Sequence, residues 1–533
     1  MGAGLEIPTH SNDPKSFDFV KAKLAECMRN HRCGRDGHLP LLPDRVIWIQ
    51  AGNATRIQLV EPKNIRAKYL CLSYCWGSVS PSTYLTNMST LKSRKDGINY
   101  IDLPPLFQDV VNCARALGIE YIWIDRLCII QGDEADFRIQ APKMGEIYGN
   151  ATLTLAAASA SSESDRILAE RDAKWLSYDL NMNVNGIGSL RLKLRRRTHP
   201  LGEERKGGDY GKVSTRAWIW QERLLSGRTV FYTPSALKFE CHHHSVWEGF
   251  GPGTVGHSWS SQLDNISHLS WLDLVEEYMR RDITRQSDRL PAMESVMKRI
   301  EKSHGWSPLW GMWANSLVES LGWESQETKS GGGHRCRMNP KYLAPTWSWA
   351  SVDGPISYAA VRPMGSNLEA RDPMIYDLEV RKLDAESGLI TLAGQIISVE
   401  LSCSIKELAL PEAHADVQAG EKALRYHYEI LNLYNDGKPF PIKPDVALKP
   451  WTGIIGGRRL STIIRVPHGE SPPEKSWNGT CLCVLVHRMK MRTLVILLGG
   501  SLRQQGAWER IGVTSGLHPS IFANSPRQIV NIA

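Results

Sequence analysis

Two residues with reactive side chains stand at the ends of predicted strands. Cys75 follows the strand-like segment 69–74, and Asp125 follows the apolar segment 121–124. Ligands of α/β sheets bind beyond the carboxyl ends of strands, so we expect both side chains to face one crevice. A thiol there could act as a nucleophile, and a carboxyl group could act as an acid or base or could orient a ligand. The alternative roles are structural: Cys75 as an apolar filler at a turn, and Asp125 as a cap or turn former.

A dense polar set occupies residues 216–223, and Glu222 is its candidate catalytic residue. Trp218 and Trp220 alternate with polar residues there, which favours a short strand or a tight turn. The arginines and the glutamate could bind a charged ligand or complete the crevice above Cys75. They could instead form a buried Arg–Glu network that joins two layers. The candidate substrate-binding residues are Tyr74, Trp76, Gly77, Gln131, Arg216, Gln221 and Arg223.

Two short runs contain residue types that bind metal ions. Cys27, His31 and Cys33 could supply three ligands, but the sequence identifies no fourth. The run 241–244 (Cys-His-His-His) cannot converge on one ion without a special turn, and no Cys-x-x-Cys motif accompanies it. The glycine-rich nucleotide fingerprint, the P-loop and the Gly-x-Ser-x-Gly elbow are also missing. We therefore expect neither a metal site nor a bound cofactor.

The segment that positions these residues alternates strands and helices. A helical apolar period lies between the strand-like segments 69–74 and 121–124. This order outlines a right-handed βαβ crossover, the unit of an α/β domain with a partly parallel sheet. A second helix is expected to include 139–148, and a third strand 152–155. The apolar positions of the first helix are Phe107, Val110, Val111, Ala114 and Leu117.

The pattern changes along the chain, and we predict four parts. Leucine alternates with lysine or arginine from 190 to 195, and arginines continue to 197, which predicts a solvated edge strand or, alternatively, a patch for a polyanion such as tRNA. Helical periods dominate 268–325, and a period of two dominates from about 370. The predicted parts are an N-terminal extension (1–64), an α/β domain (65–225), a helix-rich continuation (226–365) and a β-rich C-terminal region (366–533).

Composition places the chain among folded globular proteins. The 533 residues are 42% hydrophobic and 23% charged, which excludes a disordered chain, a collagen and a coiled coil. The net charge of +8 is too mild to indicate nucleic-acid binding by itself. Eleven cysteines, an odd number, several of them in apolar runs, suit reduced thiols in the cytoplasm. No membrane span or signal peptide is expected.

Four segments together resemble the HET (heterokaryon incompatibility) family of filamentous fungi. Any one of them could occur by chance, but their order and spacing make the combination specific. The resemblance is strongest over residues 65–225. The segments are 69–77 (YLCLSYCWG), 103–131 (ending in YIWIDRLCIIQ), 144–151 (MGEIYGNA) and 215–226 (TRAWIWQERLLS), followed by 239–241 and 247–248.

The resemblance implies a TIR-like or flavodoxin-like core with a partly parallel sheet. It further implies a role in allorecognition between fungal strains and in programmed cell death after incompatible fusion. The alternative is an enzyme on the same scaffold. This would be a TIR-like hydrolase with NAD as substrate, or a Cys75-dependent transferase of specialised metabolism that could take an aminoacyl-tRNA. The partner would be a small molecule or a protein, and homo-oligomers could form.

One position departs from the family's pattern. The helix before Met144 usually carries a glutamate four residues ahead of the methionine, and here that residue is Gln140. An amide cannot act as a general base or as an ionised stabiliser of a cationic transition state. If that glutamate serves NAD cleavage in the family, this chain should be weak or inactive as an NAD hydrolase.

Overall fold

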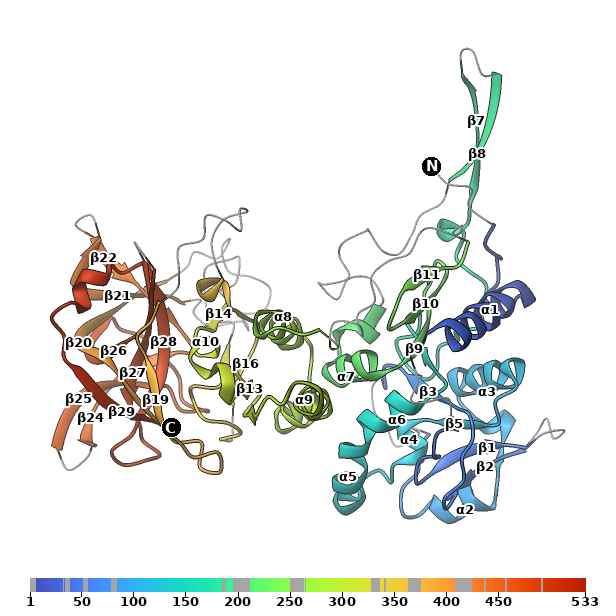
Figure 1. Cartoon of the computed structure of the whole chain (residues 1–533), viewed down its shortest axis with the longest axis horizontal. Coiled ribbons are helices and arrows are strands. Elements are labelled where there is room, and N and C mark those ends of the chain that lie inside the picture. The colour runs from blue at the N-terminus through green and yellow to red at the C-terminus, as the bar shows by residue number, and fades with distance from the viewer. Residues whose placement is uncertain are drawn as a thin grey trace. The chain divides into compact units, whose positions relative to one another are not determined.

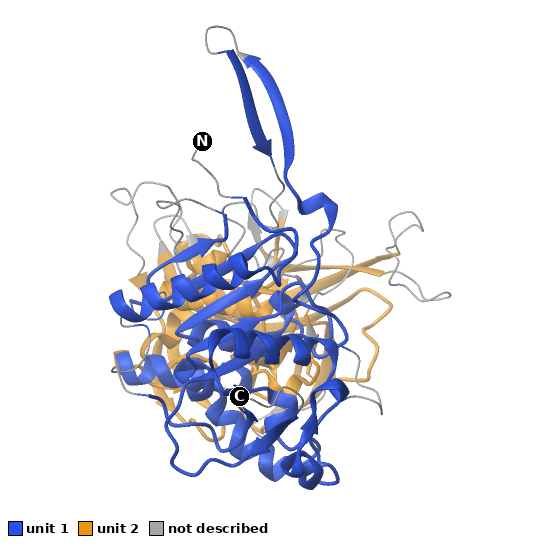
Figure 2. Ribbon diagram, turned by 90° about the vertical axis from the view of Figure 1, so that its right-hand side faces the viewer, with its two compact units in different colours: residues 1–266, 281–283, 291–303 blue, residues 267–280, 284–290, 304–533 orange. Residues whose placement is uncertain are grey.

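The structure of the chain is a computed structural model. It divides into two compact units (Figure 2): unit 1 is residues 1–266, 281–283 and 291–303, and unit 2 is residues 267–280, 284–290 and 304–533. The four-part division expected from the sequence stays a prediction. The described residues are 6–31, 33, 39–50, 56–77, 84–184, 188–194, 211–249, 263, 265–326, 336–339, 342–362, 375–407, 424–435, 438–455, 458–489 and 492–533.

A mixed sheet forms the centre of unit 1. In the described part of this unit the sheet has nine strands in the order β11-β10-β9-β6-β3-β5-β1-β2-β4. The strands are β1 (Val46–Ile49), β2 (Arg56–Val60), β3 (Tyr69–Ser73), β4 (Ile98–Asn99), β5 (Tyr121–Trp123), β6 (Leu153–Ala156), β9 (Arg228–Tyr232), β10 (Leu237–Cys241) and β11 (Ser245–Trp247). The four central strands β5, β3, β6 and β9 are parallel, and the flanking pairs are antiparallel. The sequence-based expectation of an α/β domain with a partly parallel sheet is therefore confirmed.

Helices cover both faces of this sheet. Figure 1 shows α1 and α3 on one side and α6 and α7 on the other, and the members of each pair pack together. The helices of unit 1 are α1 (Pro14–Asn30), α2 (Leu91–Asp96), α3 (Pro105–Leu117), α4 (Asp125–Cys128), α5 (Glu134–Gln140), α6 (Met144–Asn150), α7 (Ala217–Leu225) and, except for its last residue, α9 (Pro291–His304). A separate hairpin of β7 (Tyr178–Val184) and β8 (Gly188–Leu194) also belongs to this unit.

The predicted crossover is present as β3–α3–β5. Pro105 begins α3, where its missing N–H costs no hydrogen bond, and Gly118 ends it with a left-handed φ of 67°. The apolar face of α3 is buried against the sheet, and β3 pairs in parallel with β5. The second predicted helix is interrupted: α5 and α6 are separated by a 3-10 turn at Ala141–Lys143, which contains Pro142.

Unit 2 is rich in β structure, as the period of two predicts. Within its described residues, the main sheet has ten strands, mostly antiparallel. They are β18 (Ile375–Tyr376), β19 (Glu379–Leu383), β20 (Ile390–Glu407), β21 (Leu424–Asn435), β22 (Lys438–Pro441), β23 (Lys443–Pro444), β26 (Trp477–Met489), β27 (Arg492–Gly500), β28 (Trp508–Ser515) and β29 (Arg527–Ile532). Unit 2 also contains strand pairs outside the main sheet and two helices. They are β12 (Pro308–Leu309), β13 (Met312–Trp313), β14 (Glu324–Ser325), β15 (Arg337–Met338), β16 (Val352–Asp353), β17 (Ile356–Ser357), β24 (Leu448–Ile455), β25 (Arg458–Arg465), α8 (His268–Met279) and α10 (Leu317–Ser320).

Candidate functional site

Asp125 is the first residue of α4, directly beyond β5. Its Oδ2 accepts a hydrogen bond of 2.7 Å from the indole Nε1 of Trp76, and its Oδ1 accepts one of 2.7 Å from the backbone N–H of Arg126. Burial raises the pKa of the Asp125 carboxyl group, and these two hydrogen bonds, with the nearby Arg216 and Arg126 charges, oppose that rise. The chain thus holds a half-buried carboxyl group at the end of a central strand.

Two guanidinium groups lie near the Trp76 ring. The Arg126 guanidinium carbon is 4.6 Å from the ring centroid and that of Arg216 is 6.0 Å away, both within the range of cation–π attraction. Arg126 also donates to the carbonyl oxygen of Trp76 at 2.8 Å and pairs with Glu163. Trp76 is therefore held by its ring, its indole N–H and its backbone.

Glu222 lies in α7 and is 5% exposed. Burial raises the pKa of Glu222 to about 8, although the Ser73 hydroxyl favours the ionised form. The charge of Asp125 raises the pKa further, whereas Arg216 and the Tyr148 hydroxyl lower it. At neutral pH, Glu222 consequently keeps its proton. Asp125 and Glu222 are thus two carboxyl groups in different environments, and such a pair can supply an acid and a base together.

Buried polar atoms lie unpaired beside this carboxyl group. Among the described residues, Oε2 of Glu222 and both side-chain polar atoms of Gln221 have no hydrogen-bond partner. Gln221 is 1% exposed. Buried polar groups are nearly always paired with protein or water, so a water molecule or a ligand could pair with these atoms.

A small cavity adjoins the carboxyl ends of the central strands. Ser73, Ala156 and Phe231, from β3, β6 and β9, line it together with Ile219 of α7 and the nearby Arg281. Its volume is about 10 Å³, which is room for about one water molecule. A larger ligand therefore requires side chains or α7 to move.

The comparisons with known proteins identify the domain that contains these residues. The family described as "Heterokaryon incompatibility protein (HET)" matches residues 69–222. The chain contains a HET domain at these residues. Comparison with curated proteins and with solved structures finds no match. The matched segment begins at β3 and ends at Glu222, so it contains both carboxyl groups and Trp76.

The third candidate catalytic residue of the HET domain has apolar surroundings. Cys75 is 4% exposed and packs in a cluster with Val213 and Ile219. This packing suits the role of an apolar filler at a turn. The nucleophilic role of Cys75 stays a prediction.

The other candidate binding residues in the HET domain make structural contacts. Tyr74 is buried with its ring centroid 5.5 Å from that of Phe107. The Gln131 amide donates to the carbonyl oxygens of Asp125 and Ile129 at 3.2 and 3.1 Å. Gly77 has a φ of 70°, and a Cβ there would lie 2.7 Å from the Cβ of Ser162. Arg223, one residue beyond the matched segment, is buried, pairs with Glu240 at 3.3 Å and also lines the cavity.

The interpretation of residues 216–223 as a strand or turn is wrong. Residues Ala217–Leu225 form the helix α7, for which Arg216 is the N-cap residue. Trp220 is fully buried and Trp218 is partly buried. Because α7 is buried on most of its surface, its apolar residues do not mark one face, and the helical period was hidden from sequence reasoning.

The side chain of Gln140 is bound by an N-terminal residue and is not part of the group around Asp125 and Glu222. It is buried, and its Nε2 donates to Oδ2 of Asp44 at 3.0 Å. The same carboxylate oxygen pairs with Lys143 at 2.6 Å. These contacts attach the end of α5 to the segment before β1, which is a structural role for the amide.

Sequence reasoning missed one neighbour of the N-terminal cysteines. Cys241, at the end of β10, joins Cys27, His31 and Cys33. The sequence had suggested two incomplete ligand sets, each considered by itself. The two sets lie far apart in the sequence, so sequence reasoning did not show that they are adjacent in the folded unit.

In the described part of the chain, no helix is long and apolar enough to cross a membrane.

Proposed function

We propose that this HET-domain protein acts in recognition between fungal strains and in the cell death that follows incompatible fusion. The observation that carries the proposal is the HET family match over residues 69–222. The site contained in that segment supports it, because unpaired buried groups beside Glu222 provide polar partners for a small-molecule or protein ligand. We further propose that the protein works in the cytoplasm.

Strand order supports a TIR-like or flavodoxin-like core. The parallel strands β3, β5, β6 and β9 lie in the spatial order β5-β3-β6-β9, which is 2-1-3-4 in chain order. Flavodoxin-type sheets have this order, and their ligands bind where it reverses, between the first and third strands. Here that position lies between β3 and β6, whose end residues Ser73 and Ala156 line the cavity. A ligand that enlarges this cavity would couple binding to movement of α7.

A second candidate function is enzymatic, and the Asp125–Glu222 pair favours it. A protonated Glu222 could donate a proton to a leaving group, and an ionised Asp125 could stabilise a cationic transition state. A TIR-like NAD hydrolase needs such groups, but Gln140 replaces the glutamate usual in the family. A transferase of specialised metabolism would use Cys75 as its nucleophile.

The basic strand gives limited support to a tRNA substrate. Arg191 pairs with Asp179 at 2.7 Å and Lys193 with Glu6 at 2.6 Å, so its described cations are already partnered. The arginines at 195–197 lie outside the described residues.

Expression of the full chain in a filamentous fungus tests the recognition role. We expect induced expression, alone or after fusion with an incompatible strain, to kill hyphal compartments. Glu222→Gln should weaken killing, because it changes the buried polar group that the ligand would contact. Glu134→Gln, an exposed residue of α5, is the matched control. Equal viability with and without the protein in both settings would contradict the role.

Incubation of the purified chain with NAD tests the enzymatic alternative. Because of Gln140, we expect negligible nicotinamide release. Rapid release that Asp125→Asn abolishes in a folded protein would establish the hydrolase instead. If a product is detected with other substrates, its loss in Cys75→Ala but not in Cys113→Ala would favour the transferase.

A further inference from the structure

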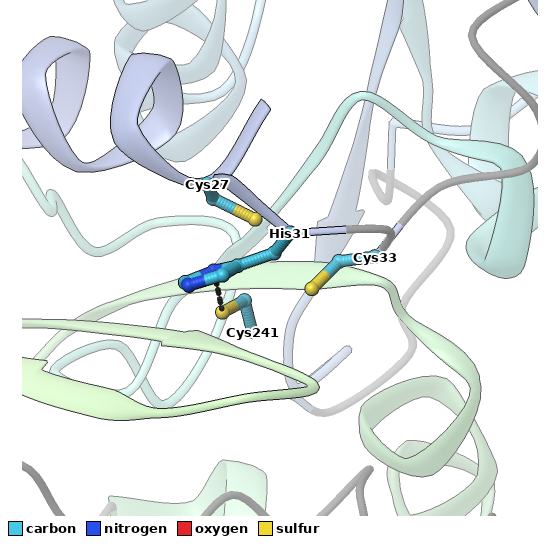
Figure 3. A group of neighbouring side chains, drawn as sticks. All are labelled: Cys27, His31, Cys33 and Cys241. Carbon is cyan, nitrogen blue, oxygen red and sulfur yellow. Dashed lines mark hydrogen bonds between the residues drawn. The ribbon is translucent and has the colours of Figure 1, made fainter. Parts of the chain in front are cut away.

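Four side chains of metal-binding type meet in unit 1 (Figure 3). They come from the end of α1, from the segment just after it and from the last residue of β10. Their ligand atoms all lie within 4.8 Å of one another. We call this group the Cys3His cluster, and its members are Cys27, His31, Cys33 and Cys241.

We propose that the Cys3His cluster binds one zinc ion as a closed structural site. Three thiolates and one imidazole are a standard tetrahedral ligand set for zinc. The cluster offers no oxygen ligand, which disfavours magnesium and calcium. Four protein ligands leave no open position for a substrate, so the ion would stabilise the fold and would not take part in catalysis.

The distances agree with a tetrahedral centre. With Zn–S bonds of about 2.3 Å and Zn–N bonds of about 2.0 Å, tetrahedral ligand atoms lie roughly 3.5–3.8 Å apart. Nδ1 of His31 is 3.6 Å from Sγ of Cys241. Since no pair of ligand atoms exceeds 4.8 Å, an ion would draw the most distant pair together by at most about 1 Å.

The local backbone brings the four ligands together. Cys27 and His31 are four residues apart at the last turn of α1, and the N–H of His31 donates to the carbonyl oxygen of Cys27. They therefore lie on the same side of the helix, one turn apart. Cys33 follows two residues later, and α1 contacts β10, which ends at Cys241.

Close packing holds Cys33 against the sheet. Gly227 precedes β9, and a Cβ at this residue would lie 2.1 Å from the carbonyl oxygen of Cys33. Only glycine permits this approach of the two backbones. Cys27, Cys33 and Cys241 are each at most 2% exposed, so the site is shielded from water.

A buried cation balances the charge of the proposed centre. Zinc with three thiolates carries a net charge of −1, which needs compensation in the interior. Nε of Arg228 lies 3.1 Å from Sγ of Cys27 and donates a hydrogen bond to it. Arg228 pairs with Cys241 in the register of β9 and β10. Hydrogen bonds from neighbouring groups to metal ligands orient the ligands and tune the site.

Two further histidines adjoin the cluster and must be distinguished from His31. Nδ1 of His244 is 3.7 Å from Sγ of Cys241. The His243 ring centroid is 4.6 Å from that of His31. We assign the imidazole ligand to His31, because it is the histidine whose ring nitrogen lies within 4.8 Å of all three sulfur atoms.

Metal analysis of the full-length protein tests the proposal. After expression with added zinc and gel filtration, we expect about one zinc ion per chain by mass spectrometry. Cys33→Ser and Cys241→Ser should reduce this content at least about tenfold, because serine is a poor zinc ligand. Cys113→Ser, which changes a buried thiol of α3 outside the cluster, should retain the metal. His31→Ala should lose it and His244→Ala should keep it; the reverse result would overturn the assigned ligand set.

A second measurement covers variants that fail to fold. In the wild-type protein, cobalt should replace zinc and give the absorption of a tetrahedral cobalt–thiolate centre, and a strong chelator should lower Tm. Zinc below about 0.1 ion per chain with thiols that react with a thiol reagent would overturn the proposal. A disulfide among the three cysteines, or iron in place of zinc, would also overturn it.

Discussion

The indole Nε1 of Trp76 donates a hydrogen bond of 2.7 Å to Oδ2 of Asp125. Trp76 follows β3 and Asp125 follows β5, so this bond joins the ends of two adjacent parallel strands. It opposes the rise in the pKa of the Asp125 carboxyl group that burial causes. The relationship explains why a tryptophan, and not another large apolar residue, suits position 76.

Trp76→Phe should destabilise unit 1 and further raise the pKa of Asp125. The substitution keeps a ring for the neighbouring arginines but removes the charge-assisted hydrogen bond, which is worth about 1.5–3 kcal/mol. Urea unfolding measures the stability, and an NMR titration of the carboxyl carbon measures the pKa. Trp175→Phe, in the 3-10 turn Ala173–Trp175, should change neither. An unchanged Asp125 pKa would contradict the role of the indole.

Glu222→Gln should change how stability depends on pH. The pKa of Glu222 rises from 4.5 to about 8 on folding. Between these values the unfolded chain releases its proton while the folded chain retains it, so stability falls as pH rises through this window. The neutral amide removes that loss, and the variant should be more stable than wild type at pH 8, on the order of 4 kcal/mol.

Unfolding curves at a series of pH values measure this effect. The exposed control Glu134→Gln should follow the wild-type pH profile. A Glu222→Gln profile that runs parallel to wild type between pH 5 and pH 8 would show that Glu222 ionises normally in the folded chain.

Gly227→Ala should destabilise the attachment of the N-terminal segment. The added methyl group would lie 2.1 Å from a backbone oxygen, and neither backbone can move without disturbing β9 or Cys33. We expect a loss of about 1–3 kcal/mol, measured as a lower Tm. Gly149→Ala is the control, because the Cβ there would meet its nearest atom at 3.4 Å and α6 gains helix propensity. Equal Tm values for the two variants would contradict the close approach.

Asp445→Asn should strongly destabilise unit 2. Oδ2 of Asp445 lies 3.0 Å from Nε of Arg510, and both side chains are 0% exposed. The neutral amide would leave a buried guanidinium charge uncompensated, at a cost of about 3–5 kcal/mol. Chemical unfolding checks this value, and Arg381→Gln at an exposed pair with Glu379 should cost under about 1 kcal/mol. Arg510 also donates to the backbone carbonyl oxygens of Leu321 and Trp323. A loss below about 1 kcal/mol for Asp445→Asn would show that these two acceptors suffice.

Local patterns in the sequence correctly predicted much of the fold. The helical period that ends at Gly118 is α3, and the apolar runs on either side are β3 and β5. The period of two after residue 370 is the main sheet of unit 2. These predictions succeed because each element has one buried face or a short apolar core, which produces a readable period. The polar residues of α7 led to the wrong prediction of a strand or turn, because almost the whole surface of this helix is buried and no single apolar face shows in the sequence.

The sequence by itself determined the central crossover, the HET resemblance and Asp125 as a carboxyl group at a strand end. Only the tertiary structure decided that Glu222 is buried near that carboxyl group, and that Cys241 completes the group begun by Cys27. Hydrogen bonds and burial within one element act over a few residues and leave a local pattern. Juxtaposition of distant residues depends on the path of the whole chain, and the pKa of a buried acid depends on the charges that this path brings near it.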